Sequence, residues 1–134
     1  MEVQIMKTLT KIGLALVLTV FLTGALLANS PGDKEYNQYL IKSLQDENVG
    51  IRSSAAQLLG ERKVEEAVKP LVKMLKTEKN ASTRIVIAMA LYQIGDEKAL
   101  PALKEVALKD KSKTVRRVVA AIVHKMNSVQ IAHK

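Results

Sequence analysis

Few side chains in this sequence have the types and spacing that catalysis or metal binding needs. The sequence contains no cysteine, which excludes disulfides, thiolate metal sites and thiol nucleophiles. Its two histidines, His124 and His133, lie nine residues apart and lack the spacing of metal ligands. We therefore expect no metal site, and we interpret His124 as an exposed helix residue.

Neighbouring carboxylates are a second source of chemistry, but their positions indicate a structural role. Glu65, Glu66 and Glu97 open two predicted helices, where acidic side chains interact favourably with the positive end of the helix dipole. The sequence also lacks a nucleophile elbow, a phosphate-binding loop and a glycine-rich dinucleotide turn. We therefore expect a protein that is not an enzyme and needs no cofactor.

The formal net charge of +8 is concentrated in the last part of the sequence. Residues 29–108 hold 12 basic and 11 acidic residues, whereas residues 109–134 hold seven basic residues and one acidic residue. This distribution indicates either a solvated end or a contact with an acidic partner. With no Trp, one Phe and three Tyr, the sequence offers few stacking platforms for single-stranded nucleic acid, so no nucleic-acid partner is expected.

The first residues have the pattern of a targeting segment. Lys7 and Lys11 precede an uncharged run over residues 12–28, which is typical of a secretory signal peptide. We interpret residues 1–28 as a signal peptide, with Met6 as its expected start. The run is also long enough to span a bilayer, so an uncleaved anchor is the alternative. Either interpretation exports the domain, to a bacterial periplasm or beyond, and membrane contact is expected only for the anchor.

An internal repeat of 32 residues organises the rest of the sequence. Arg52, Arg84 and Arg116 keep this spacing. Other families of positions share the register, among them Ala56/Ala88/Ala120, Leu59/Leu91/Val123 and Asp46/Glu78/Asp110. Because several families keep one register without an insertion, the sequence predicts a repeat architecture.

Each repeat is predicted to contain two helices. A residue type suited to N-capping precedes each first helix, namely Gly50, Ser82 and Thr114. Gly60 and Gly95 lie where two of these helices should end. The second helices are expected over residues 64–77 and 97–109, with Asp96 as the N-cap of the latter and Pro101 in its first turn.

These helices define the expected organisation of the chain. A linker over residues 29–34 leads into a helical domain over 35–127, and a tail follows over 128–134. The domain comprises a lone second helix (35–47), two complete repeats (48–78 and 79–110) and a capping helix (111–127). Residues 85–91 are apolar all round and should be buried between neighbours, whereas the apolar residues of 114–126 form one stripe and should pack on one side only.

Residues 51–75 and 83–108 resemble HEAT repeats, most closely the short bacterial kind named after phycobilisome-lyase-like proteins. The signature of a Val-Arg pair, paired alanines, Ile-Gly-Asp and Ala-Leu-Pro-Ala-Leu is nearly complete in the second repeat. The first repeat departs from it at Arg62-Lys63, and the third stops at Met126-Asn127 without a second helix. The resemblance covers about residues 46–127. It implies an all-α fold, a short right-handed α-solenoid of about three helix pairs, preceded here by the hydrophobic signal helix.

The resemblance also implies a ladder of charged pairs between the layers. An arginine in the first turn of a helix can bridge to the acid six residues before it or to the acid of the adjacent layer. The residues concerned are Asp46, Arg52, Glu78, Arg84, Asp110 and Arg116. We interpret them as structural residues.

Two basic surfaces are candidates for partner binding. One is the outer face of the second helices, usually the concave face of a HEAT stack, with Lys69, Lys73, Lys76 and Lys109 beside Glu66 and Glu105. The other is the basic C-terminal edge, with Lys109, Lys111, Lys113, Arg117 and Lys125.

Together these features predict an exported, non-enzymatic scaffold or adaptor that binds a protein partner through one of the two surfaces. The alternative is an electrostatic binder of an anionic polymer or of membrane headgroups through residues 109–125. Self-association stays open as well, because three repeats are near the lower limit for a stable solenoid.

Overall fold

The computed structural model describes residues 31–132, which contain six α-helices and no strand. The predicted signal peptide or anchor, residues 1–28, lies outside the described residues. The chain divides into two compact units, residues 1–36 and 37–134, and the packing described below is that of the second unit. None of the helices among the described residues is long and apolar enough to cross a membrane.

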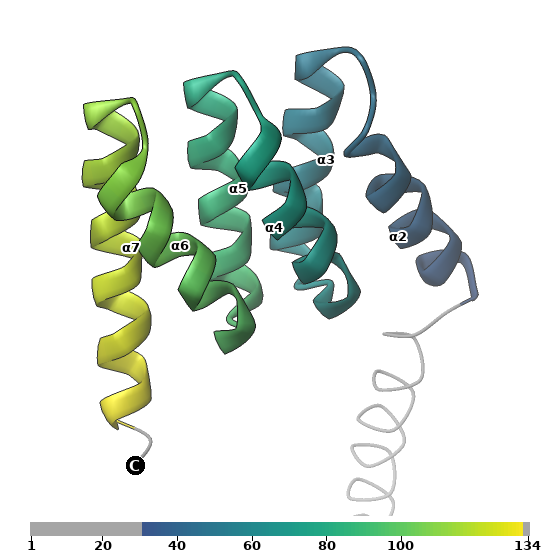
Figure 1. Ribbon diagram of the computed structural model, residues 1–134. Coiled ribbons are helices and arrows are strands. Elements are labelled where there is room, and N and C mark those ends of the chain that lie inside the picture. The colour runs from purple at the N-terminus through teal and green to yellow at the C-terminus, as the bar shows by residue number, and fades with distance from the viewer. Residues whose placement is uncertain (1–30, 133–134) are drawn as a thin grey trace, which may run out of the picture. The chain divides into compact units, whose positions relative to one another are not determined.

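The helices follow the predicted two-per-repeat order (Figure 1). They are α2 (Pro31–Ser43), α3 (Val49–Glu61), α4 (Val68–Thr77), α5 (Ala81–Ile94), α6 (Leu100–Lys109) and α7 (Lys113–Ala132). Short 3-10 turns, Glu65–Ala67 and Glu97–Ala99, lead into α4 and α6. Thus α3 and α4 form the first repeat, α5 and α6 the second, and α7 is the first helix of a third.

Some helix ends differ from the predicted boundaries. The helix α2 begins at Pro31, so residues 31–34 are helical rather than linker. Proline suits a first helical position because its missing N–H has no partner there, and Asp33 adds a favourable charge in the first turn. At the other end, α7 continues to Ala132, so residues 128–132 belong to the last helix and not to a tail.

The first helices start two residues earlier than their predicted N-caps imply. Asn48 caps α3 and accepts a hydrogen bond from the Gly50 amide, and Asn80 caps α5 and accepts one from the Thr83 amide. Gly50 and Ser82 therefore lie inside their helices, as does Thr114 in α7. Asn is among the best N-cap residues, since its short side chain reaches the unpaired amides of the first turn.

Of the two glycines predicted at helix C-termini, only Gly95 is a C-cap residue. Gly95 ends α5 with a φ of 79°, the left-handed conformation predicted for it. Gly60 instead lies within α3, and the positive φ in the first repeat, 51°, belongs to Lys63. Lys63 occupies the repeat position of Gly95. The departure from the family pattern at Arg62-Lys63 therefore puts a lysine where the second repeat has its left-handed glycine.

A continuous hydrophobic core runs through the layers. The two complete repeats contribute leucines and alanines that are almost completely buried, including Leu59, Leu71, Leu91 and Leu103. In α7 the predicted stripe is packed inward, with Val115, Val119, Ile122 and Met126 buried. In α5 the predicted burial holds for Ile87, Ala88, Ala90 and Leu91, whereas Ile85 and Val86 are partly buried and Met89 is 48% exposed.

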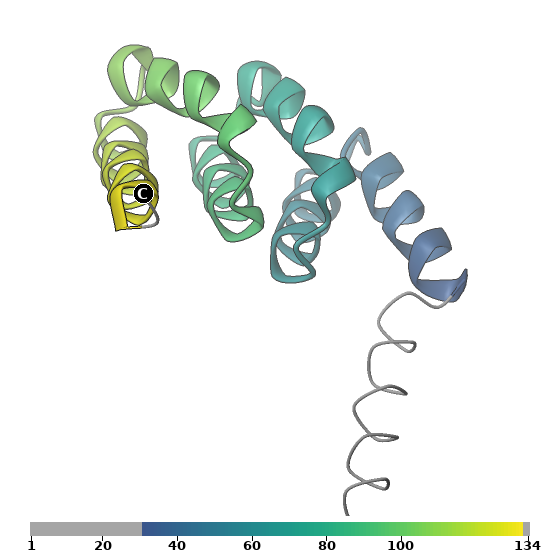
Figure 2. The ribbon, with the colours of Figure 1, turned by 90° about the horizontal axis from the view of Figure 1, so that it is seen from below.

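The helices of the second unit form two rows. Figure 2 shows α3, α5 and α7 on the inner side of a shallow curve and α4 and α6 on its outer side. The resemblance to HEAT repeats predicts a concave second-helix face, whereas α4 and α6 lie on the outer side of this curve (Figure 2). Small residues line the contact between the first helices, where Gly60 lies against Ala90, and Ala56 and Ala88 are fully buried.

Candidate protein-binding surface

Two ion pairs join the successive layers along one edge of the stack. The Arg52 guanidinium pairs with Glu78, with Nε–Oε2 at 2.9 Å. Arg84 pairs with Asp110 in the same way, with Nε–Oδ2 at 2.7 Å and a second bond from Nη2 to Oδ1 at 2.8 Å. Each arginine therefore binds the acid 26 residues ahead, in the following layer, and not the carboxylate six residues behind.

Each ladder arginine also fixes the loop that precedes its own helix. Arg52 Nη1 donates to the carbonyl oxygens of Asp46 and Glu47, and Arg84 Nη1 donates to those of Glu78 and Lys79. One side chain thus connects a loop, a first helix and the next layer. Because it binds carbonyls behind it and a carboxylate ahead, the guanidinium uses most of its donors.

The acids of the ladder are held in their charged form. Hydrogen bonds from Arg52 lower the pKa of Glu78, and hydrogen bonds from Arg84 lower that of Asp110. Both carboxylates also accept a backbone N–H two residues ahead, from Asn80 and from Ser112 respectively. The pKa values of both arginines are raised correspondingly. The negative charges of the two acids are therefore balanced by the ladder arginines within the fold.

Beside this ladder lie two clefts at equivalent places in the repeat. One, of about 450 Å³, is lined by residues of α2, α3 and α4, with Lys73 and Lys79 at its edge. The other, of about 530 Å³, lies between α4 and α6 and contains Lys76, Lys79, Lys109 and Lys111. Since the ladder arginines already pair with Glu78 and Asp110, the lysines outnumber the other acids of these clefts, which are Asp46 in the first and Glu105 in the second.

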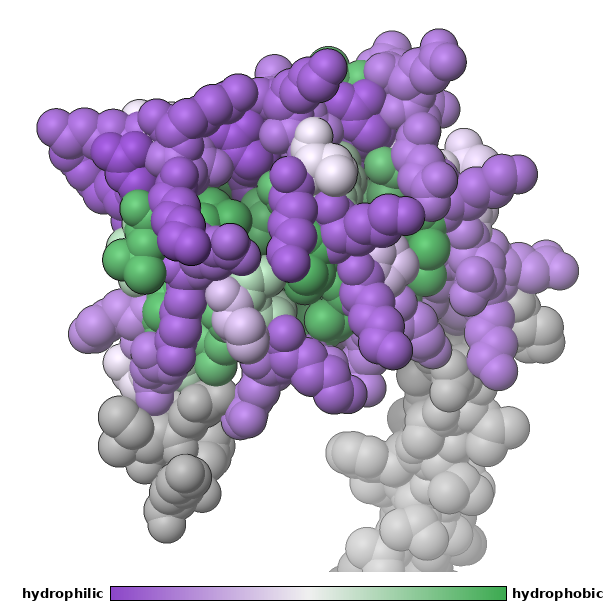
Figure 3. Space-filling model, in the orientation of Figure 1, coloured by the Kyte–Doolittle hydropathy of each residue, from purple (hydrophilic) through white to green (hydrophobic). Residues whose placement is uncertain are grey.

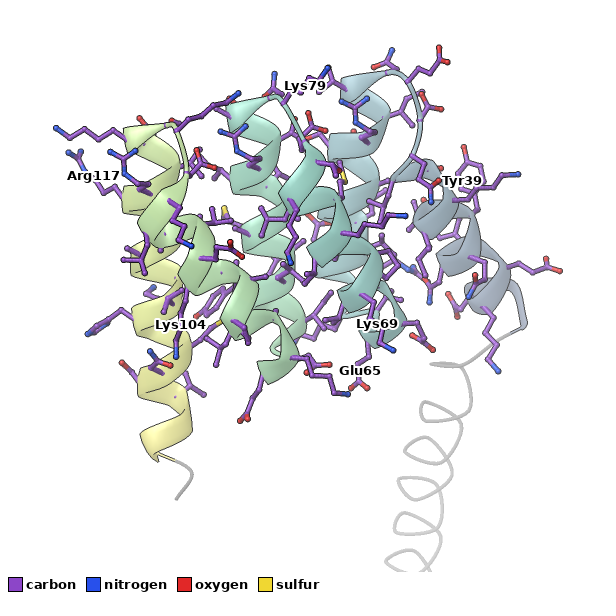
Figure 4. All side chains as sticks on the ribbon, in the orientation of Figure 1. Tyr39, Glu65, Lys69, Lys79, Lys104 and Arg117 are labelled. Atoms are coloured by element: carbon purple, nitrogen blue, oxygen red, sulfur yellow. The ribbon has the colours of Figure 1, made fainter. Side chains whose placement is uncertain are left out.

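A third shallow cleft extends this surface toward the start of α4. It has a volume of about 460 Å³ and is lined by Val68, Val72 and four lysines. Figure 4 shows Lys69 on α4 near its beginning and Lys79 beyond its end. The lysines of the three clefts, here called the lysine face, are Lys69, Lys73, Lys76, Lys79, Lys98, Lys109 and Lys111.

The lysine face unites most of the predicted binding residues. Figure 3 shows this side of the molecule, where hydrophilic side chains predominate and apolar patches are exposed between them. Two of its ammonium groups lie near acids, Lys98 at 3.9 Å from Asp96 and Lys109 at 4.0 Å from Glu105. Both are exposed pairs, which contribute little to stability and leave the lysines accessible.

Sequence reasoning missed Lys79 and Lys98. Lys79 follows a ladder acid directly, as Lys111 does 32 residues later, so the repeat itself carried the signal. Lys98 lies in the turn before α6, and only the packing of α6 beside α4 brings it to Lys69 and Lys73.

The remaining predicted residues form a separate group on α7. Lys113, Arg117 and Lys125 are all exposed. Figure 4 shows Arg117 pointing outward from α7, away from α6. The predicted basic C-terminal edge is therefore two surfaces: Lys109 and Lys111 belong to the lysine face, and the others belong to α7.

The described residues show no group of three or more histidine, aspartate or glutamate side chains that could hold a metal ion. His124 is exposed on α7, where the sequence places it. Glu78 and Asp110, whose pKa values are lowered, are both engaged by arginines of the ladder.

Comparison with known proteins shows which family of repeats the chain contains. The sequence model of the family described as HEAT repeats matches residues 37–123, which is more than half of the chain. No curated protein matches the sequence significantly. HEAT repeats generally mediate protein binding, and a domain of this kind is usually non-catalytic. With the repeat period, the paired helices and the matched segment in agreement, the chain belongs to the HEAT-repeat family.

Proposed function

We propose that this chain is a non-enzymatic scaffold that binds an acidic segment of a protein partner on the lysine face. The observation that carries the proposal is the arrangement of three adjoining clefts lined by lysines, whose buried acids are already paired with Arg52 and Arg84. Exposed lysines beside Val68 and Val72 suit a segment that combines carboxylates with a few apolar side chains.

The layered construction supports binding rather than chemistry. A stack whose layers share one core and a ladder of ion pairs presents a surface that is already ordered. Such a surface loses little conformational entropy when a partner docks, so that more of the contact energy contributes to affinity.

The proposal is tested by capturing the partner with the tagged full chain from solubilised envelope extract. The bound material is washed at low and moderate salt and identified by mass spectrometry. We expect one protein near stoichiometric amount after the moderate-salt wash, and loss of that protein when Lys69 and Lys73 are both changed to Glu. Unchanged retention by this variant would place the binding site elsewhere.

A second function is favoured by the surface of α7. Lys113, Arg117 and Lys125 are exposed on a helix whose described side chains include no acid, which suits an anionic polymer or membrane headgroups. This function predicts a heterogeneous acidic mixture that is released steeply as the salt concentration rises. It also predicts that reversing charges on α7, and not on the lysine face, removes the bound material.

We further propose that the domain is exported by residues 1–28. The basic residues and the apolar run that follows support this proposal. An intact-mass measurement on native material distinguishes a cleaved signal peptide from a retained anchor, because only cleavage removes this segment.

A further inference from the structure

The last arginine of the ladder has no carboxylate partner among the described residues. Arg116 occupies the position of Arg52 and Arg84, and its Nη1 donates to the Asp110 carbonyl as theirs donate to the loops before them. Arg52 and Arg84 each bind in addition an acid of the following layer. At Arg116 the corresponding place, on the outer side of α7, is free within the described part of the chain.

The first acid of the ladder shows the converse. Asp46 accepts the Asn48 amide, as Glu78 accepts Asn80 and Asp110 accepts Ser112. Glu78 and Asp110 also receive an arginine from the preceding layer, whereas the described residues supply none to the Asp46 carboxylate. Among the described residues, the ladder therefore has an acid without an arginine partner at its α3 end and an arginine without a carboxylate partner at its α7 end.

At both ends of the stack, residues are exposed whose repeat equivalents are buried between layers in the interior. Ile51 on α3 is 44% exposed, although the equivalent Thr83 and Val115 are 3% and 0% exposed beneath the preceding layer. On α7, Ala120 is exposed, whereas Ala56 and Ala88 are fully buried at the same repeat position. Each end thus presents the half of a contact that the interior layers complete.

We propose that a second copy of this chain docks head to tail, with the outer face of α7 against α3 of the second copy. In this arrangement Arg116 pairs with Asp46 of the second copy, Ala120 is covered, and Ile51 is buried. The charges agree, since the described side chains of α7 include no acid while Asp46 and Glu47 lie just before α3. The contact depends on Arg116, Ala120, Asp46 and Ile51, and not on the lysines of α4, so the inference does not rest on the proposed function.

The repeat geometry predicts which residues meet across this contact. Gly60 of α3 lies against Ala90 of α5, where an added Cβ would be 2.8 Å from the Ala90 Cβ. Gly60, Tyr92 and His124 occupy one repeat position, and Leu58 and Ala90 occupy another. If α7 packs on α3 of the second copy as α3 packs on α5, His124 therefore lies against Leu58 of that copy. Tyr92, at the position of His124, shows that the stack accommodates a ring there, because it is half-buried and packs on the core. A head-to-tail contact leaves an unused half at each end of a dimer, so further chains can add and assembly should grow with concentration.

The absence of cysteine from the sequence allows a direct test by disulfide cross-linking of the full chain. Chains carrying Leu58→Cys are mixed with chains carrying His124→Cys and oxidised. We expect a cross-linked dimer from the mixture and only traces from either variant alone. The matched control mixes His124→Cys with Met89→Cys, whose exposed side chain lies on the middle layer. Equal cross-linking in the control, or none between Leu58→Cys and His124→Cys, would overturn the proposal.

A charge exchange then tests the ion pair itself. Arg116→Asp is introduced beside His124→Cys, and Asp46→Arg beside Leu58→Cys. Each change alone should lower the cross-linked fraction by about tenfold, and combining both should restore it. Circular dichroism of each variant verifies its fold. Failure of the combined pair to recover, with both variants folded, would show that Arg116 does not bind Asp46 and would exclude this register. If α7 instead binds a partner of another kind, the combined pair also fails to recover, and the proposal of a second copy is again excluded.

Discussion

Arg84 connects three parts of the molecule through one guanidinium. It donates to two carbonyls of the preceding loop and to both oxygens of Asp110, and the side chains of the pair are only 5% and 6% exposed. An ion pair taken out of water gains little over apolar packing, but losing one partner is costly because a buried charge remains. This asymmetry makes the ladder a set of positions where single substitutions have large effects.

Replacing Arg84 by Ala should therefore destabilise the fold far more than replacing its exposed neighbour Lys79. We expect a loss of about 3 kcal/mol for Arg84→Ala, since the Asp110 carboxylate is left without its partner. For Lys79→Ala the expected change is within about 0.5 kcal/mol. Chemical denaturation of both variants measures the difference, and similar losses would contradict the role of the ladder.

The ladder also predicts how stability depends on pH. The pKa of Asp110 and that of Glu78 are lowered in the folded chain, so the unfolded chain binds protons more readily at acidic pH. Their contribution is complete above the unfolded pKa values of about 4 and is lost as the pH falls through the lower folded values. The unfolding free energy should decrease below about pH 4, and less steeply in Asp110→Asn. An unchanged slope in that variant would contradict the assignment.

Lys63 carries backbone strain that its repeat equivalent avoids. Its φ of 51° lies in the left-handed region, where Gly95 sits in the second repeat. Lys63→Gly should raise the unfolding free energy by about 0.5–1 kcal/mol, because glycine adopts this conformation without a Cβ clash. Lys63→Ala serves as the control, since it removes the long side chain and keeps the Cβ. Equal effects of the two changes would show that the side chain, and not the backbone, matters.

At the scale of elements, the packing of α3 against α5 depends on Gly60. A Cβ at this position would lie 2.6 Å from the Ala90 Cα and 2.5 Å from the Gln93 Oε1. The glycine that sequence reasoning assigned to the end of α3 is thus a contact residue inside the helix. Nothing in the local pattern distinguishes these roles, since both are met by a glycine near a helix C-terminus.

Gly60→Ala tests this interpretation. Helix propensity alone predicts a gain of about 1 kcal/mol for this change. Overpacking against Ala90 predicts instead a loss of about 1–3 kcal/mol, because the backbones of two helices must separate. Thermal or chemical unfolding distinguishes the two signs. A stabilised variant would show that α3 and α5 are not held at this distance.

The N-caps show what the sequence alone could predict about the elements. The 32-residue period and the apolar stripes located the six helices of residues 31–132, and they identified Asp96, Gly95 and Pro101 correctly. They placed the first-helix caps two residues late, because Gly50, Ser82 and Thr114 are acceptable caps but Asn48 and Asn80 are the residues whose side chains bind the first amides. Competing cap residues cannot be ranked from composition when several lie within one turn.

At the scale of the whole molecule, the periodic positions predicted the stack, but not its curvature. The spacing of Arg52, Arg84 and Arg116 predicted layers and the residues of the ladder. Which acid each arginine binds, and which row of helices faces inward, depend on distances between layers that no single repeat encodes. For the same reason the lysine face was predicted only in part, since α4 and α6 meet to form it.

The proposed binding surface is a property of this whole arrangement and is tested best with a purified partner. The affinity of the captured protein is measured by calorimetry for the full chain and for two double variants of equal charge change. We expect Lys76→Glu with Lys109→Glu to weaken binding by at least about a hundredfold, and Lys113→Glu with Arg117→Glu to change it by less than about threefold. The opposite ranking would contradict the lysine face as the binding site and would transfer that role to α7.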